Sequence, residues 1–128
     1  MRAAAKIILY HDDIIRLDEI KNFIDQNFNH ELHIKSLSEK FTISKSTLIR
    51  HFRSCYDVSI SGYILKCRMS HAMTLLTTHA IPISQIGITV GYQDRSAFTH
   101  AFTKFFGKPP AFYLRKTIGD AEVNQLTT

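Results

Sequence analysis

Basic side chains dominate the middle of the chain and give it the chemistry to bind a polyanion. Residues 41–116 carry ten of the sixteen Lys and Arg residues but only two of the eleven Asp and Glu residues, Asp57 and Asp94. Residues 1–40 carry six basic and seven acidic residues, so the positive charge is concentrated in one block. Such a block favours a nucleic acid first and a membrane surface second. The alternative is a solvated basic face that serves only solubility.

Two cysteine–histidine pairs could bind a metal ion. His51 and Cys55 lie four residues apart, and so do Cys67 and His71. Two such pairs can supply the four ligands of a structural zinc site. The segment between them does not have a zinc-finger pattern, and the apolar residues already give the helices a reason to pack. We therefore expect two reduced cysteines, no metal and no cofactor.

Enzyme motifs are missing from the sequence. It contains no Gly-rich phosphate loop, no Gly-x-Ser-x-Gly and no His-Glu-x-x-His. The two carboxylates of the basic block lie far apart in sequence, which leaves few candidates for general acid–base chemistry. We expect a protein that is not an enzyme.

Length and composition narrow the class further. A chain of 128 residues fits one domain or two very small ones that share a core. No apolar run approaches the ~18 residues of a membrane span, and two cysteines are too few for a disulfide scaffold. The N-terminus does not read as a signal peptide. We expect a cytoplasmic protein that does not bind membranes, because its apolar stripes are all needed for the core.

Apolar residues recur at helical spacing through most of the chain, which predicts an all-α fold of about seven helices. Ser44, Ser59 and Asp94 stand where helix N-caps are expected, and Pro82 lies near the first position of another helix. The stripes that predict the helices are Leu17, Ile20, Ile24 and Phe28; Ile34, Leu37 and Phe41; Leu48 and Phe52; Leu65, Met69, Ala72, Leu75 and Leu76; Ile83, Ile86 and Val90; Phe98, Phe102 and Phe105; and a last short helix over residues 111–116.

An internal repeat indicates the architecture. Residues 34–59 match residues 83–109, with an offset of 49 in the first helix and 50 in the second. Each copy is a short helix, a tight turn and a second helix, which is the helix-turn-helix pattern. The helix between the copies is expected to span roughly 28 Å. Since successive major grooves on one face of DNA lie about 34 Å apart, a monomer could place two reading helices one turn apart.

The second copy resembles the DNA-binding domain of the AraC/XylS transcriptional regulators. The family pattern has an aromatic residue after the turn glycine, two helical Phe, then Gly-x-x-Pro and Tyr. The residues that match it are Tyr92 after Gly91, Phe98, Phe102, Gly107, Pro110 and Tyr113; the linker matches at Arg68, Met69, Ala72, Leu75 and Leu76. The resemblance implies a bacterial transcription regulator that binds double-stranded DNA and contacts RNA polymerase. With no room for a small-molecule effector domain, the chain resembles the standalone subgroup typified by MarA and SoxS.

Four residues depart from the family pattern. Ser38 and Gly87 stand where the family prefers Ala, and Gly87 should weaken its helix by up to ~1 kcal/mol. Thr42 replaces the turn glycine of the first copy, so its backbone must avoid a positive φ or absorb strain. Leu114 stands where an Arg usually follows the final Tyr. The first copy is thus the less regular one.

In the first copy, Leu48 and Phe52 should face the core and leave an opposite face free. By the resemblance, this face reads bases. The base-contacting positions are Ser46, Ile49 and Arg50, and the expected phosphate contacts are Lys45 and Arg53. Arg50 can pair with guanine O6 and N7, and Ile49 suits a thymine methyl group. The alternative for Ile49 is a packing residue at the rim.

In the second copy, Phe98 and Phe102 should face inward. The base-contacting positions implied by the resemblance are Arg95, Ser96, Thr99 and His100, and the expected phosphate contacts are Lys104 and Lys108. Arg95 is the strongest candidate for a base contact. His100 could bond a base edge or a phosphate, and its alternative is a solvated surface histidine. Arg68 is expected to brace the fold, not to contact DNA.

The expected organisation follows from these assignments. Residues 1–58 form an N-terminal extension and the first helix-turn-helix subdomain, residues 59–79 the linker helix, residues 80–116 the second subdomain and residues 117–128 a flexible tail. The expected function is that of a monomeric, sequence-specific activator that inserts two helices into successive major grooves and recruits RNA polymerase. The alternative is a basic module that binds RNA polymerase or another regulator without reading sequence itself.

Overall fold

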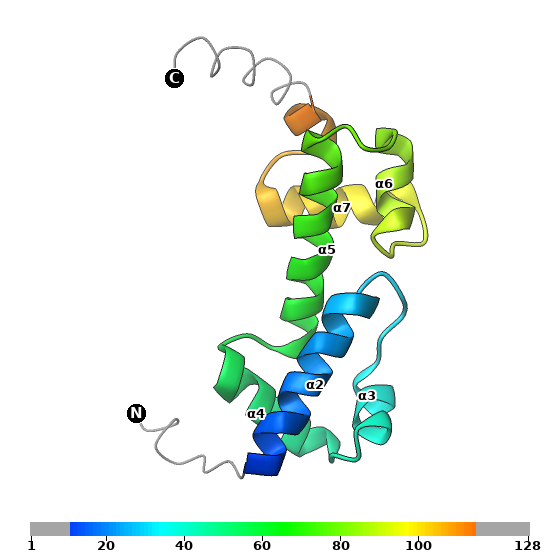
Figure 1. The fold of residues 1–128 in the computed structure, drawn as a ribbon. Coiled ribbons are helices and arrows are strands. Elements are labelled where there is room, and N and C mark those ends of the chain that lie inside the picture. The colour runs from blue at the N-terminus through cyan, green and yellow to red at the C-terminus, as the bar shows by residue number, and fades with distance from the viewer. Residues whose placement is uncertain (1–10, 115–128) are drawn as a thin grey trace. The chain divides into compact units, whose positions relative to one another are not determined.

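The computed structural model describes residues 11–114, and every regular element within them is a helix (Figure 1). The all-α prediction is confirmed. The helices are α2 (His11–Asn27), α3 (Ile34–Lys40), α4 (Lys45–Tyr56), α5 (Ile60–Thr77), α6 (Ile83–Thr89) and α7 (Arg95–Phe106), and residues 110–114 are also helical. The predicted tail and the end of the predicted last helix lie outside the described residues. No helix within this part of the chain is long and apolar enough to cross a bilayer.

The chain divides into two compact units, and the division falls inside α5, between Cys67 and Arg68. The first unit contains α2, α3, α4 and the beginning of α5. Figure 1 shows α3 and α4 joined by a short turn, with α2 packed on α4. Its core is built from the predicted stripes: Leu17, Ile20, Ile24, Leu37, Ile43, Leu48, Phe52 and Ile60.

The second unit contains the rest of α5, then α6, α7 and the helical residues 110–114. Helices α6 and α7 pack on one another as α3 and α4 do (Figure 1). Its buried apolar side chains are Met69, Ala72, Leu76, Ile86, Val90, Phe98 and Phe102. Both copies of the repeat therefore fold as helix-turn-helix pairs.

Side-chain caps begin three of these helices, as predicted. The Ser44 Oγ accepts a hydrogen bond from the Thr47 N–H at 3.2 Å, and the Asp94 Oδ1 accepts one from the Ala97 N–H at 2.7 Å. The Ser59 Oγ accepts from the Gly62 N–H at 3.0 Å. Each cap satisfies a donor that the helix itself leaves unpaired. Pro82 is the N-cap residue of α6, directly before its first helical position.

Phe105 does not lie with Phe98 and Phe102, so that prediction is wrong. Phe105 is 43% exposed, and it is Phe106 whose ring lies 4.6 Å from the Phe102 ring. Helical spacing allows either Phe105 or Phe106 on this side, since both lie three or four residues after Phe102. Tyr113 packs on Phe102 and Phe106 and donates its hydroxyl to the Phe106 carbonyl at 2.8 Å.

Each turn of the repeats holds one residue at positive φ, and the two residues differ in type. Gly91 has φ 112° and Thr42 has φ 56°. The first turn therefore absorbs the strain anticipated for Thr42, because a β-branched residue is disfavoured at positive φ. The first unit keeps the turn geometry despite its less regular sequence.

Candidate nucleic-acid interface

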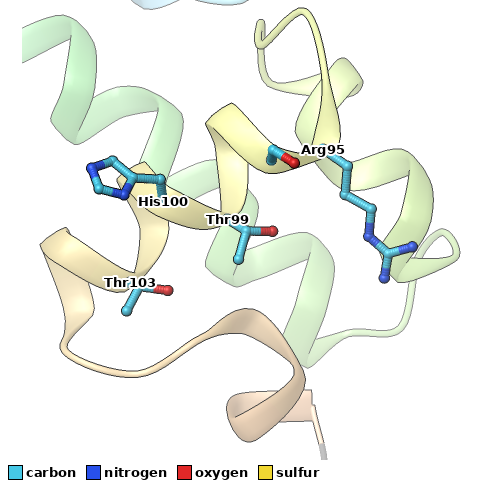
Figure 2. Close-up of a pocket in the computed structure, with 5 residues that line it drawn as sticks. Arg95, Thr99, His100 and Thr103 are labelled. Atoms are coloured by element: carbon cyan, nitrogen blue, oxygen red, sulfur yellow. The ribbon is translucent and has the colours of Figure 1, made fainter.

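Helix α7 presents one polar face to solvent. Phe98 and Phe102 are buried on the opposite side, at 1% and 0% exposure. The outer face lines an open hollow through Arg95, Ser96, Thr99, His100 and Thr103. Figure 2 shows Thr99 between the Arg95 and His100 side chains, with Thr103 one turn further along the helix. The four predicted reading residues of the second copy therefore lie together.

Thr103 belongs to this face but was not among the predicted residues. It follows Thr99 by four residues and Ser96 by seven, so it lies on the same side of the helix. This spacing could have identified it. The reading positions that the family resemblance implies end at His100.

The groups on the α7 face suit a nucleic acid. A guanidinium offers five donors, hydroxyls both donate and accept, and imidazole can do either. The hollow has no carboxylate lining it, since its residues are Arg, Ser, Thr and His. The neighbouring Asp94 carboxylate accepts from the Ala97 N–H at its own helix start. The surface can therefore donate to phosphates and base edges, and no carboxylate lines the hollow itself.

Helix α4 presents a more cationic face. Leu48 and Phe52 are fully buried, which leaves the opposite side of the helix to solvent. The predicted residues of the first copy are all exposed: Lys45, Ser46, Ile49, Arg50 and Arg53. Ile49 is 51% exposed, so it does not serve the core as the rim-packing alternative would require. An exposed β-branched side chain between cations remains available for contact with a thymine methyl.

Equivalent positions carry different chemistry in the two units. Lys45 and Arg95 are the first residues of α4 and α7. At the offset of fifty residues, Arg50 corresponds to His100, and Arg53 corresponds to Thr103. At these three positions the first unit therefore has three permanent cations, whereas the second has one cation, an imidazole and a hydroxyl.

The remaining predicted phosphate contacts are also exposed. Lys104 lies in the last turn of α7, and Lys108 follows the helix C-cap Gly107. The Lys108 Nζ lies 5.6 Å from the centre of the Phe112 ring. These positions leave both cations at the surface of the second unit.

Arg68 braces the second unit. Its guanidinium lies 5.3 Å from the centre of the ring of Tyr92, the residue that follows the turn glycine Gly91. The Tyr92 ring in turn packs against Phe98. Burial raises the pKa of Tyr92, and the nearby Arg68 opposes that rise. The contact stabilises the turn that leads into α7.

The cysteine–histidine pairs do not form a metal site in the described part of the chain. No group of three or more His, Cys, Asp or Glu residues between residues 11 and 114 lies close enough to share an ion. Both cysteines are free. Burial raises the pKa of both thiols, which disfavours the thiolate that binds metal.

Known proteins are similar to this chain over most of its length. Residues 37–116 match a family model described as a helix-turn-helix domain. The Msm operon regulatory protein of Streptococcus mutans is 31% identical over 100 residues, covering 78% of this chain and 36% of that protein. The transcriptional activator RhaR of Mannheimia succiniciproducens is 26% identical over 108 residues, covering 84% and 39%. The chain thus spans less than half the length of these relatives.

A solved structure agrees with these matches. The C-terminal domain of AraT, a response regulator from Geobacillus stearothermophilus, has a TM-score of 0.75 to this chain at 28% identity. The similarity covers 79% of this chain and 84% of that domain. The likeness includes both helix-turn-helix units, because they make up most of the described residues.

Proposed function

Because this chain belongs to the AraC/XylS family of helix-turn-helix transcriptional regulators, we propose that it binds double-stranded DNA and reads its sequence with two helices. The observation that carries the proposal is the outer face of α7. Arg95, Thr99 and His100 lie on it side by side, and the hollow that they line has no carboxylate (Figure 2). Base edges in the major groove present the acceptors and donors that such a face can bond.

The two helices would act within one chain. Most helix-turn-helix proteins reach two half-sites by forming a dimer. This chain carries two such units, with reading faces on α4 and α7, so a monomer can contact two half-sites. Since the two faces differ in chemistry, the bound site would be asymmetric. Arg50 and Arg95 would each read a guanine, while Lys45, Arg53, Lys104 and Lys108 would bond phosphates.

We further propose that the chain activates transcription by contact with RNA polymerase, in the bacterial cytoplasm. The name of its relative RhaR, a transcriptional activator, supports this direction of regulation. That this chain belongs to the small standalone subgroup stays a prediction. In-vitro transcription with purified bacterial RNA polymerase, from a template that carries the selected site, should give more transcript when the protein is added.

Selection of bound sequences from a random DNA pool at near-physiological salt tests the reading function. The expected result is an asymmetric motif of two blocks about one helical turn apart. One enriched block would mean that a single unit reads and the other only binds the backbone. Binding without enrichment would contradict sequence reading and favour the interaction module.

A further inference from the structure

Helix α2 lies before the residues that match the helix-turn-helix family model, yet it is bonded to the first reading helix. The Tyr56 hydroxyl donates to Asp18 Oδ1. Seven residues further along both segments, the Tyr63 hydroxyl donates to Asp25 Oδ1. Because seven residues are two helical turns, both bonds lie on one side of α2.

A lysine lies between the two bonds. The Lys21 Nζ is 5.6 Å from the centre of the Tyr56 ring and 5.2 Å from that of the Tyr63 ring. Its positive charge is attracted to the faces of both rings. Asp18, Lys21 and Asp25 thus form one polar strip along α2, which we call the α2 strip.

The first bond acts at the end of the reading helix. Tyr56 is the last residue of α4, and its ring lies 4.7 Å from the buried Phe52 ring. Arg53 lies one turn before Tyr56, and Arg50 lies nearly two turns before it. The hydroxyl bond therefore holds the last turn of α4, from which Arg53 projects, and Arg50 lies in the middle of the same helix.

The second unit fastens its reading helix at the same position. Phe106 is the last residue of α7 and corresponds to Tyr56. Its carbonyl accepts the Tyr113 hydroxyl at 2.8 Å. In each unit, a tyrosine hydroxyl ties the last residue of the reading helix to a segment outside the helix-turn-helix pair.

We propose that Asp18 is a positioning residue for DNA reading: by accepting the Tyr56 hydroxyl, it fixes the last turn of α4 and so the geometry with which Arg50 and Arg53 meet DNA. The proposal rests on the proposed function. It makes α2 a part of the reading apparatus, although α2 lies outside the matched domain and carries acidic residues that would repel DNA.

Tyr56→Phe is the primary test, because it removes the hydroxyl and keeps the ring that packs on Phe52. Binding is measured to three duplexes: the selected site, the site with its first block scrambled, and the site with its second block scrambled. The first block is the one whose preference is relaxed by Arg50→Ala. Tyr56→Phe should weaken binding about threefold to tenfold wherever the first block is intact. It should leave binding unchanged where that block is scrambled.

Two matched variants separate positioning from general stability. Tyr63→Phe removes the equivalent hydrogen bond from α5, which carries no reading residue, so it should change binding to none of the duplexes. Tyr113→Phe should show the reverse pattern to Tyr56→Phe and weaken only binding to duplexes with an intact second block.

A pair of variants at Asp18 tests the acceptor. Asp18→Asn keeps an acceptor oxygen and should retain the binding to the first block that Asp18→Ala loses.

Each outcome decides the proposal. Equal losses on all three duplexes, or equal losses for Tyr56→Phe and Tyr63→Phe, would show a merely structural role and overturn it. If the wild type prefers the selected site and Tyr56→Phe binds all three duplexes as the wild type does, only the positioning role is overturned. If the wild-type chain does not distinguish the selected site from its scrambled forms, the proposed function fails, and the positioning role fails with it.

Discussion

Gly87 of α6 and Phe98 of α7 approach so closely that no side chain fits between them. A Cβ built on Gly87 would lie 2.7 Å from the Phe98 Cβ and 2.9 Å from its Cγ. The sequence suggested only that this glycine weakens its helix. The structure shows what it permits instead, which is the close packing of α6 on α7 in the second helix-turn-helix pair.

Gly87→Ala should therefore destabilise the second unit despite the better helix propensity of alanine. Propensity would contribute about 1 kcal/mol in favour, whereas overpacking costs about 1–3 kcal/mol. We expect lower protection of α6 and α7 amides from hydrogen exchange, with α3 and α4 unchanged. The matched control is Ser38→Ala in the first unit, which removes only a hydroxyl that donates to the Lys35 carbonyl of its own helix. A gain in stability from Gly87→Ala would show that the helices can move apart at little cost.

Thr42→Gly should stabilise the first unit. Thr42 has φ 56°, where an L-residue is disfavoured by about 1–2 kcal/mol. The greater freedom of glycine in the unfolded chain offsets part of that gain, about 0.4–1 kcal/mol. Urea unfolding should show a net increase of roughly 0.5–1 kcal/mol. The reverse change in the second unit, Gly91→Thr, should be destabilising; a loss of stability in Thr42→Gly would contradict the strain at this turn.

Arg95→Ala should relax base preference at one position of the bound site. A bidentate contact to a base is worth about 1–3 kcal/mol of discrimination, so the enriched motif should lose one base while the rest remains. Lys104→Ala is the control: a phosphate contact should weaken binding to all sequences equally and lower the dependence on salt. If Arg95→Ala weakens all sequences equally, Arg95 bonds a phosphate and the reading assignment is wrong.

A comparison of Arg50→Ala with Arg95→Ala tests whether the two units read equally. The first unit has Thr42 at positive φ in its turn and the small Ser46 on its reading helix. We therefore expect the first unit to contribute less specificity, so that Arg50→Ala reduces specificity less than Arg95→Ala. Equal losses of specificity in the selected motifs would argue against this difference.

Stability should fall at alkaline pH because of the two tyrosines bonded to the α2 strip. Burial, reinforced by the hydrogen bond to Asp18, raises the pKa of Tyr56 above its usual value of 10.0. Burial and the bond to Asp25 raise that of Tyr63 in the same way. Above the usual tyrosine pKa, the unfolded chain loses these protons before the folded chain does. The free energy of unfolding must then decrease as pH rises.

Unfolding by urea at a series of pH values from neutral to above 10 measures this effect. The double variant with Tyr56→Phe and Tyr63→Phe should show a shallower decrease than the wild type. Some decrease should remain, since burial also raises the pKa of Tyr92 in the second unit. Equal slopes in the two proteins would mean that the folded state does not hold these phenolic protons.

The sequence alone determined the features that depend on near neighbours in the chain. The caps Ser44 and Asp94 bond residues three positions later, and the burial of Leu48 and Phe52 follows from a spacing of four residues. The repeat then implied two similar units. Such features are local and periodic, so one stretch of sequence contains all the groups that decide them. The same periodicity put most of the candidate reading residues on exposed faces.

The tertiary structure decided what depends on residues far apart in sequence. Tyr113 packs on Phe106 from a segment beyond α7, and Gly87 is needed because Phe98 approaches it from another helix. The bond between Asp18 and Tyr56 joins residues 38 positions apart. No periodic pattern specifies such a pair, because the free energy of each contact depends on where other segments place their atoms.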